Sequence, residues 1–195
     1  MIPLPEGPFG CILADPPWHH KSRSPKGQGR RSPSHHYPTM PLADIKALPV
    51  GDIAAPNCHL FLWTTGPHLE QAFSVMKAWG FSYSSDVFVW VKLNPRQGDA
   101  MLYDDGSFAV GMGYTSRKNT EYVLLGRKGR PVRMAKDVRQ LIVSPRRQHS
   151  RKPEEARRRI ERYVGDVPKV ELFAREAAPG WVAWGNETEK FNGVE

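Results

Sequence analysis

Short apolar runs, separated by polar stretches rich in glycine and proline, set the pattern of this chain. Five of the runs are nearly continuous and only a few residues long, which is typical of buried strands. They cover residues 10–14, 59–65, 86–94, 121–126 and 169–175. A shorter apolar run lies at residues 141–143, and we expect the ordered chain to end with residues 180–187.

Two longer segments repeat their apolar residues with the period of a helix instead. Residues 67–80 start with a proline suited to a first turn and end in Gly80, a residue that commonly follows helices. Residues 152–164 open with Pro153, and two glutamates then sit favourably against the helix dipole. We expect a further short helix over residues 43–48. The inner faces should be Leu69, Phe73 and Met76, with Ala72 and Trp79 at the edges, in the first helix, and Ala156, Ile160 and Val164 in the second.

Strands that alternate with helices predict an α/β fold, in which a mostly parallel sheet is covered by helices on both faces. The chain is long enough for one sizeable core, and neither a repeat nor a domain linker interrupts it. We therefore expect a single domain over residues 1–195. Two loops, residues 16–41 and 95–120, exceed the usual length of structureless connections. We interpret the first as a lid and the second as a substrate-side loop.

A net charge of +8 and a pI of about 9.7 favour a polyanionic partner, most simply nucleic acid, over a merely solvated basic surface. Cys11 and Cys58 lie in or beside apolar runs, which is typical of buried thiols in a reducing compartment rather than of a disulfide or a metal site. No apolar run approaches the ~18 residues of a membrane span, and the first residues lack the pattern of a signal peptide. We therefore expect a cytoplasmic protein.

The stretch "ADPPW" places chemistry at the end of the first expected strand. In open α/β sheets, ligands bind outside the carboxyl ends of the strands, which is where Asp15 lies. Pro16 and Pro17 fix two φ angles and remove two N–H donors. We therefore expect the Pro16 carbonyl to accept no hydrogen bond within a helix or a sheet. A carboxylate beside a fixed carbonyl makes a two-acceptor clamp for a planar –NH2 group. Trp18 is suited to stack on the ring that carries this amine.

Such a clamp is useful because an aromatic amine is a poor nucleophile, its lone pair being delocalised into the ring. Two acceptors on its hydrogens favour a pyramidal nitrogen and return the lone pair to it. The effect is stronger in the transition state than in the ground state, so it is catalytic. The reaction still needs an electrophile, and the natural one is the sulfonium methyl group of S-adenosylmethionine. No metal is needed.

Seven motifs, in a fixed order, carry a resemblance to a known family. "ADPPW" matches the Asp/Asn/Ser-Pro-Pro-aromatic tetrapeptide of amino-group methyltransferases. The other six are "YPTM" (37–40), "LFLWTT" (60–65), "VWVKLN" (89–94), "SRKPEE" (150–155), "ELFAR" (171–175) and "GWVAWGNE" (180–187). The chain resembles the messenger-RNA N6-adenosine methyltransferase (seventy-kilodalton-subunit) family in its short bacterial and phage form. The resemblance implies a Rossmann-like class I methyltransferase fold with a permuted order, in which the catalytic motif precedes the cofactor motif.

The cofactor side is expected near the end of the chain. No G-x-G-x-x-G follows a strand, which leaves a nicotinamide cofactor little support, whereas Glu171 is suited to accept from ribose hydroxyls. By resemblance, Lys152 meets the carboxylate of the cofactor's methionine part. The rest of the implied cofactor set is Asp15, Leu172, Phe173, Arg175, Asn186 and Glu187. Relatives often carry His-Asn soon after "ELFAR", but here the run is Glu176-Ala177-Ala178, so part of the pocket must be supplied otherwise.

The same resemblance places the substrate side in residues 111–121. Arg117 and Asn119 are candidates for contact with phosphate or base, and Glu121 for bracing the site. Lys92, in "VWVKLN", and Tyr37, which would close over the pocket from the lid, complete the set together with Trp18.

Two further clusters leave alternatives open. The pairs His19–His20 and His35–His36 favour a solvated loop over a metal site, because no acidic or cysteine partner stands at metal-ligand spacing. Part of an arginine group around the second helix is a candidate for phosphate binding, and the rest is solvated. The group is Arg146, Arg147, Arg151, Arg157, Arg158, Arg159 and Arg162.

The sequence thus predicts an S-adenosylmethionine-dependent methyltransferase that acts on the N6 amino group of adenine in nucleic acid, with DNA favoured over RNA. Asp15 with Trp18 favours adenine, because cytosine N4 enzymes tend to carry Ser-Pro-Pro and protein-glutamine enzymes Asn-Pro-Pro-Tyr. The alternatives are an RNA N6-adenosine methyltransferase and a non-catalytic, nucleic-acid-binding subunit of a heteromeric complex. A homodimer or heterodimer fits a chain with no evident target-recognition domain.

Overall fold

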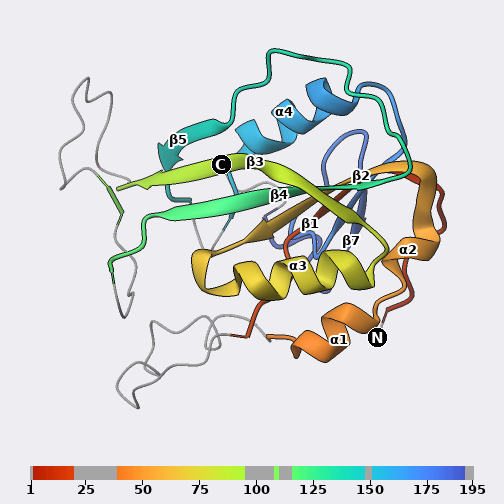
Figure 1. The fold of residues 1–195 in the computed structure, drawn as a ribbon. Helices are drawn as coiled ribbons and strands as arrows, with labels where there is room; N and C mark the ends of the chain where they lie inside the picture. Colours follow the sequence, from red (N-terminus) through yellow and green to blue (C-terminus); the bar gives the residue numbers. More distant parts are fainter. Residues whose placement is uncertain (1, 20–38, 95–107, 110–115, 148–150, 192–195) are drawn as a thin grey trace.

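The computed structural model describes residues 2–19, 39–94, 108–109, 116–147 and 151–191, which build a seven-stranded sheet with helices packed on it (Figure 1). The strands lie in the order β5-β3-β4-β2-β1-β6-β7. Their bounds are β1 Phe9–Ala14, β2 Ala54–Thr64, β3 Ser82–Leu93, β4 Thr120–Lys128, β5 Leu141–Pro145, β6 Lys169–Leu172 and β7 Val182–Trp184. All five strands expected from the sequence are present, and β5 and β7 extend the sheet at its two edges.

The sheet is mostly parallel, as the near-continuous apolar runs predicted. β1 pairs in parallel with β2 and β6, β6 with β7, and β3 with β5. Among the strands of the described residues, β4 alone runs the other way, antiparallel to its neighbours β2 and β3. β1 and β6 are far apart in sequence but adjacent in the sheet, so their carboxyl ends lie side by side.

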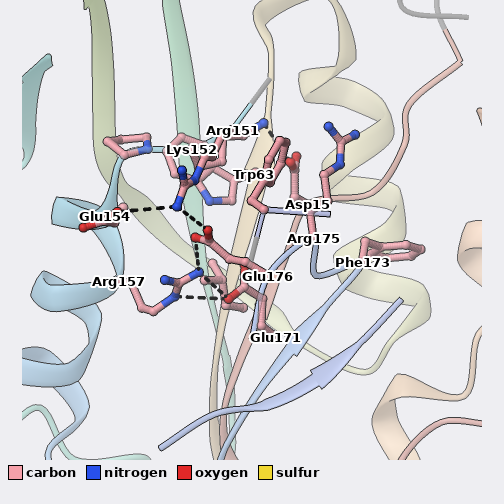
Figure 2. Close-up of a pocket in the computed structure, with 14 residues that line it drawn as sticks. Asp15, Trp63, Arg151, Lys152, Glu154, Arg157, Glu171, Phe173, Arg175 and Glu176 are labelled. Atoms are coloured by element: carbon pink, nitrogen blue, oxygen red, sulfur yellow. Dashed lines mark hydrogen bonds and ion pairs between the residues drawn. The ribbon is translucent and has the colours of Figure 1, made fainter. Parts of the chain in front are cut away.

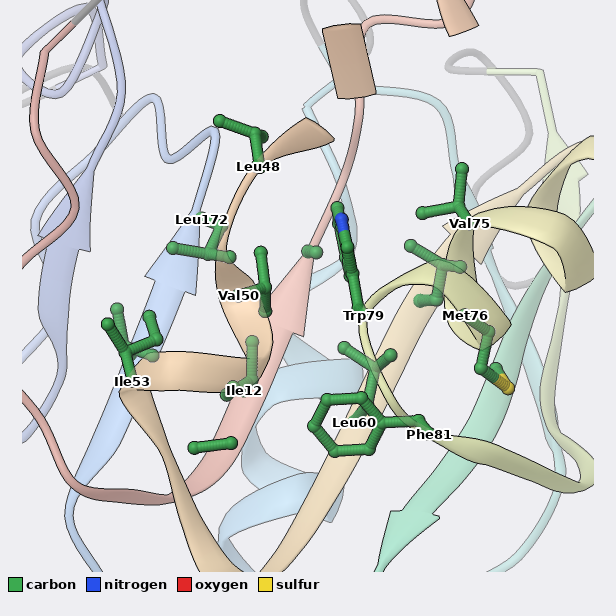
Figure 3. Packing of buried hydrophobic residues seen from close by; sticks show 14 of the residues in the cluster. Ile12, Leu48, Val50, Ile53, Leu60, Val75, Met76, Trp79, Phe81 and Leu172 are labelled. Carbon is green, nitrogen blue, oxygen red and sulfur yellow. The ribbon is translucent and has the colours of Figure 1, made fainter. Parts of the chain in front are cut away.

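Helices cover both faces of the sheet, which confirms the expected layering. They are α1 Leu42–Ala47, α2 Val50–Ile53, the 3₁₀ turn η3 Gly66–His68, α3 Leu69–Ala78 and α4 Glu154–Val164. Alternate residues of β1 point to opposite faces: Ile12 packs in one cluster with α1, α2 and α3, and Leu13 in another with α4. Figure 3 shows the first cluster, with Ile12 and Leu60 of the central strands near Trp79.

The inner face of α3 differs from the expected one. Phe73 is 41% exposed and packs edge-to-face against Tyr83 of β3. Met76 is buried as expected and Leu69 packs against the same cluster, but Ala72 and Trp79 lie on the buried face with Val75 rather than at its edges. Trp79, whose indole N–H donates to the Ile45 carbonyl at 2.9 Å, fixes this rotation of the helix. In α4 the expected inner residues are buried: Ala156, Ile160 and Val164.

Both cysteines are buried free thiols, as the sequence indicated. Cys11 and Cys58 belong to different clusters, on opposite faces of the sheet. Burial raises the pKa of Cys58 to about 12 and that of Cys11 well above its usual range. Protonated, buried thiols are poor nucleophiles and poor metal ligands, so both act as core residues. None of the helices in the described part of the chain is long and apolar enough to cross a membrane.

Candidate active site

The carboxyl ends of β1 and β6 meet at one end of the sheet and form one side of a pocket. The two strands pair with Leu13 opposite Glu171 and Ala14 opposite Leu172. Asp15 follows β1 directly, and its N–H donates to the Leu172 carbonyl at 3.4 Å. Open α/β sheets bind ligands outside this end of their strands. The sheet itself therefore brings the two predicted carboxylates to one place.

Figure 2 shows this pocket, which the start of α4 completes. Five residues expected at the site from the sequence line it: Asp15, Lys152, Glu171, Phe173 and Arg175. The others that line it are Leu13, Trp63, Arg151, Pro153, Glu154, Ala156, Arg157, Glu176 and Phe191. Charged groups of both signs thus face one another across a space bounded by β1, β6 and α4.

The Asp-Pro-Pro-Trp stretch forms a tight turn. This corrects the expectation that the Pro16 carbonyl has no local hydrogen bond. The Pro16 carbonyl accepts the Trp18 N–H at 2.8 Å, an i→i+2 hydrogen bond that defines a γ-turn centred on Pro17. The ring of Pro17 fixes φ close to the value that an inverse γ-turn needs. The Pro16 carbonyl is therefore already hydrogen-bonded. Because a carbonyl oxygen has two lone pairs, the turn uses one and fixes the direction of the other.

Trp18 lies in the core, so this structure does not support base stacking by its ring. It is 5% exposed, and its Nε1–H donates to the Trp63 carbonyl at 3.1 Å. Its ring stacks on His68 with the centroids 5.7 Å apart. A base needs an uncovered ring face, which a residue this buried does not offer. Trp18 instead fastens the turn after Asp15 to β2.

A chain of alternating charges runs from Asp15 toward the predicted substrate side. Lys152 Nζ lies 2.8 Å from Asp15 Oδ2 and 3.2 Å from Glu121 Oε2. The other oxygen of Glu121 accepts from Lys92. Burial alone would raise the pKa of Glu121, but the two lysines outweigh it and hold the pKa below its usual range. Glu121 therefore stays ionised and fixes Lys152 beside Asp15.

A second charged cluster surrounds Glu171. Arg157 of α4 donates from Nε and Nη2 to the same oxygen, Glu171 Oε2, at 3.2 and 3.0 Å. Glu176 joins this guanidinium, at 3.2 Å, to that of Arg151, at 2.6 Å. Burial raises the pKa of Glu171, and the charge of Arg157 opposes this rise. Sequence reasoning missed the roles of Arg157 and Glu176; the one signal was the replacement of the family's His-Asn by Glu176 and its neighbours.

The remaining cofactor-side predictions are divided between pocket, core and surface. Phe173 lines the pocket with φ of 61°, a value uncommon for residues other than glycine, while Leu172 is fully buried in the core. Arg175 lines the pocket and lies 3.6 Å from Glu187. Asn186, in the turn after β7, is exposed, and neither it nor Glu187 lines this pocket.

The substrate-side predictions are only partly described. Lys92 and Glu121 belong to the charge chain, and the Lys92 N–H donates to the Asn119 carbonyl at 2.9 Å. Arg117 is exposed. Tyr37 lies outside the described residues, as do His20, His35 and His36. Within the described ranges, no group of three or more His, Cys, Asp or Glu side chains is placed to hold a metal ion.

Most arginines around α4 are paired with carboxylates, which makes them poorer candidates for phosphate binding. The pairs are Arg147 with Glu154, Arg151 with Glu176, Arg157 with Glu171, Arg158 and Arg159 with Glu155, and Arg162 with Asp137. Their charge is largely balanced within the protein.

Fold and site together define a class of protein. A mostly parallel sheet covered on both faces, with carboxylates from two neighbouring strands at its carboxyl end, is consistent with a Rossmann-like methyltransferase fold. The profile of the MT-A70 family matches residues 9–187, and the chain belongs to this family. The resemblance carried by the seven motifs is thereby confirmed.

Individual relatives cover nearly all of the chain. The type II methyltransferase M.MunI of a Mycoplasma species is 34% identical over an alignment of 200 positions, which covers 94% of this chain and 79% of that protein. The human N(6)-adenine-specific methyltransferase METTL4 is 33% identical over 96% of this chain and 39% of its own length. An Arabidopsis thaliana N(6)-adenosine-methyltransferase, MT-A70-like, is 31% identical over 96% of this chain and 24% of its own. The chain thus spans less than half of the plant and human relatives.

Proposed function

We propose that this chain is an S-adenosylmethionine-dependent methyltransferase that methylates the N6 amino group of adenine in nucleic acid, with DNA favoured over RNA. One observation carries the proposal. Asp15, bonded through its N–H to the Leu172 carbonyl, and the Pro16 carbonyl, held by the γ-turn, lie at the end of β1 beside a pocket that also presents Lys152 and Glu171. Relatives named for adenine or adenosine methylation support the same reaction.

The side chains of the pocket match the groups of S-adenosylmethionine. Lys152 offers a cation to the carboxylate of its methionine part. Oε2 of Glu171 is held by Arg157, and Oε1 takes no hydrogen bond from the described residues, so one oxygen remains for ribose hydroxyls. Phe173 and Phe191 provide apolar surface for the adenine ring. When bound, the cofactor supplies an electrophilic methyl group.

Asp15 keeps acceptor capacity for a substrate amine even while it is paired. Lys152 lies against Oδ2, and Oδ1 takes no hydrogen bond from the described part of the chain. An ionised carboxylate offers about four lone-pair sites. One amino N–H therefore donates to Asp15 Oδ1 and the other to the second lone pair of the Pro16 carbonyl. These hydrogen bonds strengthen as the nitrogen becomes pyramidal and attacks, which is the condition for catalysis.

The substrate is expected to be adenine within a polynucleotide. In a duplex the base must leave the stack to reach Asp15 at the end of β1. The preference for DNA rests on the resemblance to short bacterial and phage members of the family. Asp15 orients the amine, and the proton released after methylation passes to this carboxylate or to water.

Transfer of a labelled methyl group from S-adenosylmethionine tests the proposal. The native chain should label matched single- and double-stranded DNA and RNA to different extents, DNA most. Asp15→Asn removes the negative charge with little change in shape and should lower the rate by at least about 10²-fold. The matched control is Asp44→Asn, an exposed aspartate in α1, which should leave the rate unchanged.

The outcomes separate the candidate functions. Transfer that ranks RNA above DNA would contradict the preference but keep the reaction. Cofactor binding without transfer to any of the four substrates would favour the non-catalytic subunit of a heteromeric complex. Undiminished transfer by Asp15→Asn would overturn the role given to this carboxylate.

A further inference from the structure

A strongly basic segment lies away from the pocket. We call residues 127–139 the basic link; they comprise the last two residues of β4 and most of the connection from β4 to β5. The basic link holds six arginines and lysines and one aspartate, a net charge of +5 out of +8 for the whole chain. One of the six, Lys128, points inward and donates to the Gly51 carbonyl at 2.8 Å. The other five are exposed: Arg127, Arg130, Arg133, Lys136 and Arg139.

These five cations differ from the arginines of the neighbouring helix. On α4, even the most exposed ones, Arg158 and Arg162, have carboxylate partners at 2.9 and 2.8 Å. None of the five exposed cations of the basic link forms an ion pair with any residue that the structure describes. The single acidic residue of the link, Asp137, forms an ion pair with Arg162 of α4. The charge of the basic link is therefore available to an external anion.

The backbone of the basic link is hydrogen-bonded to α4, although the side chains of the link are exposed. The Met134 N–H donates to the Tyr163 carbonyl at 2.9 Å. Arg159 of α4 donates to the carbonyls of Arg139 and Leu141 at 2.6 and 2.8 Å. A fixed backbone presents its cations in one arrangement, which lowers the entropy lost when they bind a partner.

The basic link lies on the same side of the sheet as α4, whose beginning lines the pocket. In Figure 1 the link runs from the end of β4 across α4 to β5. α4 starts at the pocket with Glu154, and the link is joined to it at Arg162. From Glu154 to Arg162, eight residues further along the helix, the rise is about 12 Å, which is the distance along α4 from the pocket to the link. A polynucleotide with one base in the pocket is therefore long enough to reach the link.

We propose that the basic link is a second nucleic-acid surface, which binds the phosphates that flank the target adenine. This inference rests on the proposed function and adds to it a site for the phosphates of the substrate. Exposed arginines and lysines bind phosphates without reading sequence, so the link adds affinity and orientation rather than specificity. Five cations within thirteen residues fit a polyanion with closely spaced charges better than a single acidic side chain.

The test is the salt dependence of binding to a labelled DNA duplex of about 20 base pairs, two helical turns. The double variant Arg130→Gln/Arg133→Gln should weaken binding. It should also reduce the slope of log Kd against log salt by about two, because each lost phosphate contact removes about one unit. Its affinity for S-adenosylmethionine should not change, which shows that the fold and the pocket are intact.

A matched control separates a local surface from the net charge. Lys46→Gln/Lys77→Gln removes the same two charges from exposed positions in α1 and α3, which cover the other face of the sheet. This variant should keep the slope of the native protein to within about half a unit.

Three results would overturn the inference. They are an unchanged slope in the link variant, an equal fall in the link variant and its control, and loss of binding to an acidic protein segment with binding to DNA intact. All three leave the proposed methyl transfer standing. If the native chain binds no nucleic acid at any salt concentration, the proposed function itself fails with the inference.

Discussion

The two oxygens of the Glu171 carboxylate have different surroundings. Oε2 accepts both hydrogen bonds from Arg157, whereas Oε1 accepts none from the described residues. The charged groups that act on this carboxylate are Arg157, which lowers its pKa, and Glu176 and Asp15, which raise it together with burial. Arg157 is therefore a positioning residue: it holds Glu171 in one orientation and opposes the rise of its pKa that burial causes.

Removal of this guanidinium should make cofactor binding depend on pH. In Arg157→Met the pKa of Glu171 rises further, so near neutral pH more of the carboxyl group is protonated and accepts hydrogen bonds less well. Binding of S-adenosylmethionine, measured by calorimetry, should be weakened more, relative to native, at about pH 6 than at about pH 8. Arg157→Lys keeps the charge and should show a smaller difference. An equal loss at both pH values would indicate a merely structural role.

At this scale the sequence predicted the residues that short motifs define and missed those set by packing. Asp15, Lys152 and Glu171 follow from "ADPPW", "SRKPEE" and "ELFAR", and all three line one pocket. The burial of Trp18 could not be read from its motif, because it depends on a hydrogen bond to Trp63, forty-five residues away.

At the scale of elements, Glu121 of β4 connects three parts of the site. It accepts from Lys92 of β3 and pairs with Lys152, which lies just before α4. β3 and β4 follow each other in the chain, whereas β5 separates them from α4, so a single buried carboxylate links both strands to the start of α4. The strands and helices themselves were predictable from periodicity, whereas the rotation of α3 was not, because Trp79 sets it through Ile45.

Glu121→Gln should therefore destabilise the protein in a pH-dependent way. At neutral pH the loss of free energy of unfolding should be about 1–3 kcal/mol, since two lysines lose their shared anion. The folded pKa of Glu121 is lowered, so its contribution is present above the unfolded pKa of about 4.3 and is lost as pH falls through the folded value. Urea denaturation should thus show a difference that shrinks below about pH 4.

The control for this prediction is Glu154→Gln. Glu154 also pairs with an arginine, but its side chain is 53% exposed, and exposed pairs contribute only about 0–1 kcal/mol. If both variants lose the same stability, or if the difference for Glu121→Gln does not depend on pH, then Glu121 does not hold the site together.

At the scale of the whole molecule, paired charges and exposed, unpaired cations lie in different regions. The pocket at the carboxyl end of β1 and β6 holds acids and bases that are paired with one another, while residues 127–139 carry five exposed cations that form no ion pair with a described residue. The net charge predicted a polyanionic partner, but not where it binds. The arginines expected to bind phosphate are those of α4, and the fold pairs them internally.

The central claim is that Asp15 directs a methyl group to the exocyclic nitrogen of adenine. It is tested most directly by mass spectrometry of nucleosides from DNA whose adenine amino groups carry ¹⁵N, after incubation with the protein and S-adenosylmethionine. We predict one new nucleoside, N6-methyl-2′-deoxyadenosine with the methyl group on the labelled nitrogen, and its loss in Asp15→Asn. A methyl group on a ring nitrogen or on cytosine, or an equal yield from the variant, would contradict it.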